Sequence, residues 1–125
     1  MKTSEYIKSA IKTESNDFEP IKNRLQSEQT IRLLHAGMGL STESAEILDS
    51  LKKHIFYGKP LDEVNLKEEM GDLFWYLAIM ADSLNIDFET IMSKNIEKLK
   101  ARYGQKFSEE KAIERNLILE RQTLE

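Results

Sequence analysis

The sequence predicts an all-α protein, a bundle of four to five helices. Only five glycines and two prolines occur in 125 residues, fewer turn residues than β-sheet proteins usually need. Apolar residues recur at spacings of three and four, and no segment alternates apolar and polar residues with a period of two. With 40% hydrophobic and 32% charged residues, the chain has enough apolar side chains to fold.

Turn and capping residues divide the chain into the expected helices. These cover residues 4–13, 20–36, 42–56, 61–84 and 87–103, followed by a polar terminal helix over 108–125. The residues expected to begin, interrupt or end them are Pro20, Gly37, Gly39, Ser41 or Thr42, Gly58, Pro60, Asn85, Asp87 and Gly104. We therefore expect an N-terminal helix and linker over 1–19, a main helical domain over 20–107 and a helical tail over 108–125.

Composition excludes several classes of protein. Eighteen Lys and Arg against 22 Asp and Glu give a net charge of −4, so we expect no stable nucleic-acid binding. The absence of cysteine excludes disulfides, Cys-ligated zinc and iron–sulfur clusters. The uncharged run over residues 73–81 is far shorter than the ~20 residues of a membrane span, and residues 1–10 do not resemble a signal peptide. We expect a cytoplasmic protein.

Two pairs of carboxylates are the first candidate site. Glu43 and Glu46 are three residues apart, as are Glu69 and Asp72. At about 100° per residue, each pair lies along the edge of an apolar helix stripe. The stripes are Leu40, Ser44, Ile47, Leu48, Leu51 and Ile55 in one helix, and Leu66, Met70, Leu73, Leu77, Met80 and Leu84 in the other. Antiparallel packing through these stripes would bring the four acids together at the seam.

Asp72 is the strongest indication of a metal site, because it directly precedes the uncharged run over residues 73–81 and is therefore expected to be buried. Glu-x-x-Glu pairs are common on solvated helix faces, but two pairs beside apolar stripes favour a site. Buried carboxylates without a partner are costly, and several together repel one another. A divalent cation would compensate them, and oxygen ligands without Cys or His suit Mg²⁺, with Mn²⁺ as the alternative.

A third group of polar residues supplies candidate cations. Asn95, Lys98 and Arg102 are spaced i, i+3 and i+7, so they share a helix face. Lys98 and Arg102 could hold phosphate oxygens there, or they could simply favour the negative end of the helix dipole. Carboxylates for a metal and cations for phosphates are the parts that metal-assisted hydrolysis of a phosphoanhydride needs. The aromatic candidates for stacking on a nucleobase are His35, Phe56, Tyr57, Trp75 and Tyr76. Of these, Trp75 and Tyr76 lie closest to the acids in the sequence.

The order of these segments resembles the MazG-like all-α nucleoside triphosphate pyrophosphohydrolases. Residues 39–43 resemble the family's lead-in to the first acidic pair, residues 68–73 its second block and residues 95–103 its third. The resemblance covers about residues 30–107. It implies hydrolysis of a (d)NTP between the α and β phosphorus, giving a (d)NMP and pyrophosphate.

The same resemblance implies roles for single residues. Glu43, Glu46, Glu69 and Asp72 would hold Mg²⁺ and take part in catalysis, and Asn95, Lys98 and Arg102 would bind the substrate. Glu68 lies further from the stripe than Glu69, so we expect it to be exposed or behind the ligands. The resemblance also implies an active site completed in a homodimer or homotetramer.

Three alternatives remain. The scaffold could carry the related dUTPase or phosphoribosyl-ATP pyrophosphohydrolase activity. The chain could be a non-catalytic helical interaction or regulatory protein, although all four acids are present. A di-iron carboxylate bundle is disfavoured because such bundles usually use Glu-x-x-His pairs, and His35 and His54 lie outside both acidic pairs.

Overall fold

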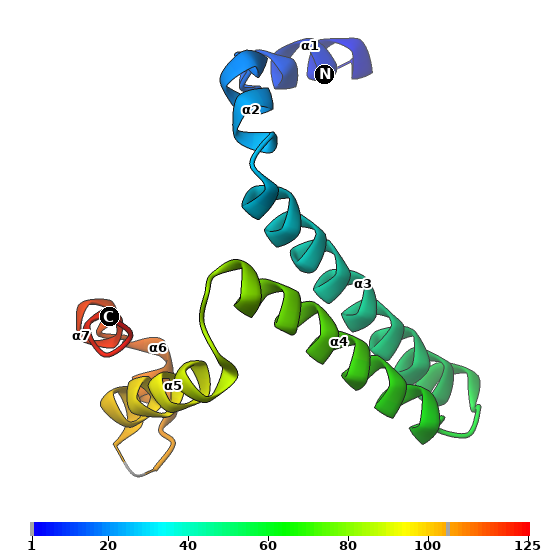
Figure 1. Ribbon diagram of the computed structural model, residues 1–125. Coiled ribbons are helices and arrows are strands. Elements are labelled where there is room, and N and C mark those ends of the chain that lie inside the picture. Colours follow the sequence, from blue (N-terminus) through cyan, green and yellow to red (C-terminus); the bar gives the residue numbers. More distant parts are fainter. Residues whose placement is uncertain (1, 105) are drawn as a thin grey trace.

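The computed structural model describes residues 2–104 and 106–125, and this part of the chain is all-α, as predicted. It contains seven helices and no strand. They are α1 (Thr3–Ile11), α2 (Phe18–Leu25), α3 (Glu28–Tyr57), α4 (Glu63–Ser83), α5 (Phe88–Tyr103), α6 (Glu109–Ile113) and α7 (Leu117–Gln122). Figure 1 shows α3 and α4 lying side by side, with α1 and α2 beyond one end of α3 and α5 to α7 grouped at the end of α4.

The antiparallel hairpin of α3 and α4 is the centre of the fold. Near its open end, Gln29 Nε2 donates a hydrogen bond to the carbonyl of Ser83 at 2.7 Å, and Arg32 Nη2 lies 2.5 Å from Asp82 Oδ2. At the other end, Gly58 ends α3 with a left-handed φ of 66°, as its place in the sequence predicts. These contacts fix which residues of the two helices face each other.

The structure confirms the predicted ends of the later helices. Asp87 caps α5, because its Oδ1 accepts a hydrogen bond from the Thr90 amide at 2.7 Å. Asn85 follows α4 with a positive φ of 52°, and Gly104 ends α5 with a φ of 70°. The predicted single helix over 108–125 is wrong: α6 and α7 are two short helices, both packed on α5. Within the described residues, no helix is long and apolar enough to cross a membrane.

The predicted helix break at Gly37 and Gly39 is wrong, because α3 continues through both glycines. The break falls earlier, at residues 26–27, where the Ser27 side chain caps α3. Thr42, an expected cap, instead donates its hydroxyl hydrogen bond back to the carbonyl of Gly39 at 2.9 Å. Packing explains the continuity: a Cβ at Gly39 would lie 2.1 Å from Tyr76 Cε1 on α4, so the missing side chain lets the two helices approach.

The predicted core stripes are only partly buried: Ile47, Leu51 and Leu73 are half-buried, while other members are exposed. Residues at the polar edge also face α3, because Glu69 is buried and Tyr76 lies against Gly39. Leu48 and Ile55, assigned to the core stripe of the first helix, are each 66% exposed. Ala36 and Ala81 are the apolar residues that are buried within the described chain. The most deeply buried residues of the hairpin are therefore small or polar, and several large apolar side chains remain uncovered.

The two helix-interior glycines give a matched test of this packing. We expect Gly39→Ala to destabilise the fold by about 1–3 kcal/mol, because the new methyl group would meet the Tyr76 ring. Gly37→Ala meets nothing within 4 Å, so it should stabilise α3 by up to about 1 kcal/mol through helix propensity. Urea denaturation followed by circular dichroism measures both free energies of unfolding. Equal effects of the two substitutions would contradict the close approach.

Candidate functional site

Three carboxylates from α3 and α4 meet in the seam of the hairpin. One oxygen each of Glu43, Glu69 and Asp72 lies within 4.8 Å of the other two. Glu69 is the most enclosed, at 7% exposure, whereas Glu43 is half-buried and Asp72 is exposed. The cluster is therefore walled by the helices on one side and open to solvent at Asp72.

Glu69 is the acid of this cluster whose pKa is shifted. Asn65 Nδ2 donates a hydrogen bond to Glu69 Oε1 at 2.7 Å from one turn earlier on α4, which lowers the carboxyl pKa. Burial raises that pKa more, and the neighbouring carboxylates of Glu43 and Glu46 raise it further. The net result is a raised pKa, as expected for an enclosed acid among like charges.

Glu46 lies beside this cluster but is not one of its three members. It is exposed, and its charge is felt at Glu69. It also lines a cleft of about 500 Å³ near the α3–α4 turn, together with Lys53, Lys59 and Glu68. Glu68 is exposed, as predicted, so the cleft connects the rim of the acidic cluster with two lysines.

The donor set fits a hard divalent cation. All three clustered groups offer carboxylate oxygens, and their spacing allows one ion to contact each of them. A cation would also offset the repulsion that raises the pKa of Glu69. The residues therefore fit Mg²⁺ or Mn²⁺, which prefer oxygen ligands.

The two aromatic candidates belong to a small cluster next to the acids. Trp75 and Tyr76 follow Asp72 by one helical turn, and their ring centroids are 4.9 Å apart in an edge-to-face contact. His35 on α3 completes the cluster, with its ring centroid 5.7 Å from that of Tyr76 and 6.3 Å from that of Trp75. Trp75 is 56% exposed, so more than half of this side chain is open to solvent.

The structure does not bring the α5 candidates to the acids within one chain. Asn95 is exposed, Lys98 is half-buried, and α5 packs on α6 and α7. Figure 1 shows α5 beyond the end of α4, on the side away from the α3–α4 turn. The cationic face predicted from sequence is therefore a separate surface of this chain.

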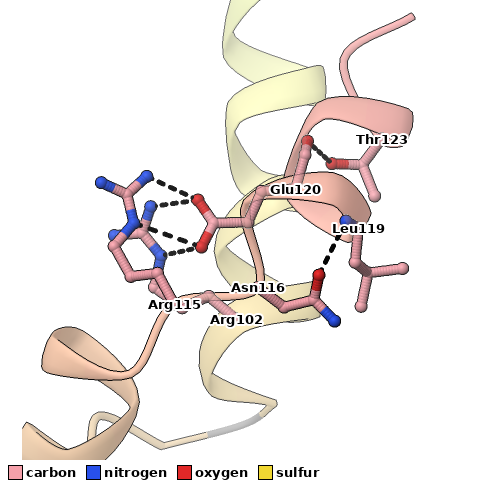
Figure 2. Close-up of polar contacts among 6 residues, drawn as sticks. All are labelled: Arg102, Arg115, Asn116, Leu119, Glu120 and Thr123. Atoms are coloured by element: carbon pink, nitrogen blue, oxygen red, sulfur yellow. Dashed lines mark hydrogen bonds and ion pairs between the residues drawn. The ribbon is translucent and has the colours of Figure 1, made fainter.

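Arg102 has an unexpected partner at the end of this face. Its Nε donates to Glu120 Oε1 at 2.8 Å, and its Nη2 pairs with Glu120 Oε2. Arg115 Nη2 reaches the same Oε2 atom at 2.7 Å, so two guanidiniums hold one carboxylate (Figure 2). Glu120 is only 3% exposed, and hydrogen bonds from both arginines lower its pKa to about 2. We call these three residues the arginine clasp.

The similarity of this chain to known proteins covers the helices that carry the acidic cluster. The model of the MazG nucleotide pyrophosphohydrolase domain matches residues 29–107, which contain α4, α5, all but the first residue of α3 and all four predicted acids. The chain belongs to the MazG nucleotide pyrophosphohydrolase family. This confirms the family predicted from the acidic blocks.

One curated relative of the MazG-family chain is the Gene 37 protein of Mycobacterium phage L5. The two are 32% identical over 77 residues, which is 56% of this chain and 65% of the relative. The match thus spans less than two thirds of that protein. No solved structure matches the chain significantly.

Sequence analysis missed two parts of this MazG-family site. Asn65 stands four residues before Glu69, a spacing that places both on one helix face and could have indicated their hydrogen bond. Arg115 and Glu120 lie outside the matched residues 29–107, and no short-range spacing connects Glu120 with Arg102. Their contact depends on how the tail folds back onto α5.

Glu69→Gln tests the repulsion in the seam. The amide oxygen can still accept from Asn65, while the buried charge is removed. We expect a higher melting temperature without metal and a smaller rise on adding Mg²⁺, both measured by differential scanning fluorimetry at pH 7. Glu68→Gln removes a charge from the neighbouring exposed position and should leave both values near wild type. The same result for both variants would contradict a strained acidic cluster.

The arginine clasp predicts acid-sensitive docking of the tail. Because the folded-state pKa of Glu120 is about 2 against an ordinary 4.5, its contribution to stability is complete above pH 4.5. It is lost as the pH falls from about 4.5 toward about 2. Amide hydrogen exchange in residues 117–122 should accelerate over this range, beyond the intrinsic change with pH. Glu120→Gln should remove that additional acceleration, and its persistence in this variant would contradict the assignment.

Proposed function

We propose that this chain hydrolyses a (deoxy)nucleoside triphosphate at the α–β phosphoanhydride, in a metal-dependent reaction that gives a monophosphate and pyrophosphate. The observation that carries the proposal is the convergence of Glu43, Glu69 and Asp72 in the seam of the hairpin. Membership of the MazG nucleotide pyrophosphohydrolase family supports the same class of reaction.

The acids of the hairpin would hold the metal. Glu43, Glu69 and Asp72 would supply the three clustered oxygens, and Glu46 lies beside them, where its charge is felt at Glu69. When bound, Mg²⁺ would neutralise phosphate charge and lower the pKa of water nearby. Asn65 keeps the Glu69 carboxylate in its place through the 2.7 Å hydrogen bond.

The reaction needs a base and an acceptor for the leaving charge. A carboxylate of the acidic group would take the proton from water as the water oxygen bonds to the α phosphorus. The bond from the α phosphorus to the bridging oxygen breaks, and pyrophosphate leaves with that oxygen. Asn95, Lys98 and Arg102 would contact phosphate oxygens. Trp75 and Tyr76 would lie next to the nucleobase of the substrate.

A second copy of the chain would complete this site. Lys98 and Arg102 do not approach the acids of their own chain, so they would serve the acids of a partner. The uncovered apolar face of α4 supports such an assembly: Phe74 is 61% exposed and lines an apolar groove with Leu77, Met80 and residues of α5. A homodimer or homotetramer would cover this face.

Asp72→Asn tests the chemistry directly. We expect turnover to fall about a hundredfold or more, because the variant loses one anionic ligand of the metal at the open side of the cluster. The assay is a panel of NTPs and dNTPs with Mg²⁺, with chromatography of the products. Release of monophosphate and pyrophosphate from (d)NTPs other than dUTP supports the proposal. Cleavage of dUTP alone would indicate a dUTPase, and cleavage of phosphoribosyl-ATP alone would indicate a phosphoribosyl-ATP pyrophosphohydrolase.

Control variants define how the Asp72→Asn result is judged. Glu63→Gln alters an exposed acid in the first turn of the same helix and should keep wild-type turnover. Circular dichroism should show an unchanged helical content for both variants. Wild-type turnover by folded Asp72→Asn would reject the site, and a wild-type chain that cleaves no nucleotide would favour the non-catalytic helical protein.

Phe74→Glu tests the assembly. A charge on the uncovered apolar face should prevent its burial, so we expect a smaller species in sedimentation velocity and a loss of most activity. Mixing this variant with an inactive Asp72→Asn chain should not restore activity, because the two cannot associate. A wild-type chain that sediments as a monomer while fully active would contradict completion of the site by a partner.

A further inference from the structure

The arginine clasp joins the C-terminal tail to the end of the α5 face that the proposed function assigns to phosphate binding. Arg102 comes from α5, whereas Arg115 and Glu120 come from the tail, beyond the residues that match the family model. Lys94 Nζ adds a second link by donating to the carbonyl of Leu124 at 2.7 Å. The tail is thus fixed against the very helix that carries Asn95 and Lys98.

The geometry of the clasp leaves part of each guanidinium for another acceptor. The hydrogen bonds from Arg102 and Arg115 to Glu120 use Nε and Nη2 of each side chain. The Nη1 amino group of each arginine is therefore not occupied by Glu120. Two positive charges facing one carboxylate also leave a net charge of +1, which favours an anion.

Burial shows which residue organises the group. Glu120 is almost fully enclosed, and only 14% of the Arg102 side chain is exposed, against 43% for Arg115. A carboxylate held by two forks restricts the rotation of both arginines, so little further side-chain entropy is lost when a phosphate binds. Figure 2 shows the two guanidiniums on the same side of the Glu120 carboxylate.

We propose that Glu120 is a positioning residue that holds Arg102 and Arg115 together as a paired guanidinium site for the phosphate chain of the substrate. The inference rests on the proposed function and deepens it, because it adds Arg115 to the phosphate-binding residues. It assigns the tail a role in substrate affinity rather than in the chemical step. The acids of the hairpin remain the residues that perform the chemistry.

Binding of a non-hydrolysable α,β-imido deoxynucleoside triphosphate with Mg²⁺, measured by isothermal titration calorimetry on the full chain, tests this role. Glu120→Gln should weaken binding about tenfold, the loss expected when a charge-assisted hydrogen bond no longer fixes a guanidinium. KM should rise by a similar factor while kcat stays within about twofold of wild type. In an Arg102→Ala background, Glu120→Gln should have a much smaller effect, because one of the two guanidiniums it positions is gone.

Two further variants keep the test decisive. Glu125→Gln breaks an exposed ion pair with Arg121 in the same tail and should bind like wild type. Glu120→Gln could release the tail, which would be seen as rapid amide exchange in residues 117–122. In that case, the binding measured for Arg115→Ala tests the inference. This substitution leaves Arg102 paired with Glu120 and should weaken binding about fivefold or more.

Two results would overturn the inference. Unchanged binding in both Glu120→Gln and Arg115→Ala would show that the clasp only attaches the tail. Tighter binding in Glu120→Gln would show that the carboxylate competes with the substrate. Either result in a chain that still hydrolyses its substrate leaves the proposed function intact, whereas a wild-type chain that neither binds nor cleaves any (d)NTP removes the proposed function itself.

Discussion

The burial of one carboxylate beside others in the seam of α3 and α4 is the constraint that the rest of the structure must accommodate. Glu43, Glu69 and Asp72 approach within 4.8 Å, and Glu69 is buried there, so its pKa is raised. Neutral hydrogen bonds, from Asn65 to Glu69 and from the Thr42 hydroxyl to Glu43, support this arrangement but do not balance the charges. The fold thus brings together carboxylates whose mutual repulsion a divalent cation would offset.

The close approach of the two helices determines what else the hairpin can do. Gly39 admits the Tyr76 ring, and the other buried residues of the two helices are Ala36, Ser50, Glu69 and Ala81. Several large apolar side chains, among them Leu48, Ile55 and Phe74, are more than half exposed in a single chain. The same helix packing therefore accounts for the acids between the two helices and for the uncovered apolar side chains, which connects the proposed chemistry with the proposed assembly.

Much of this could be predicted from the sequence, because helix periodicity and capping are local. The all-α class, the acidic pairs and the ends at Gly58 and Asp87 follow from neighbours a few residues apart. Gly39 was misjudged because its role depends on Tyr76, 37 residues away in the sequence, and not on helix propensity. The apolar stripes were assigned to the seam because periodicity locates a face but does not say which neighbour covers it. The arginine clasp depends on the path of the tail, which no short-range pattern encodes.

The central claim is that these three carboxylates together hold a divalent cation. Anomalous diffraction from crystals grown with Mn²⁺, an ion that suits the same oxygen ligands, tests it most directly. The account predicts a manganese peak in the α3–α4 seam, in contact with oxygens of Glu43, Glu69 and Asp72. Crystals with no manganese there, and with the three side chains directed apart into solvent, would contradict it.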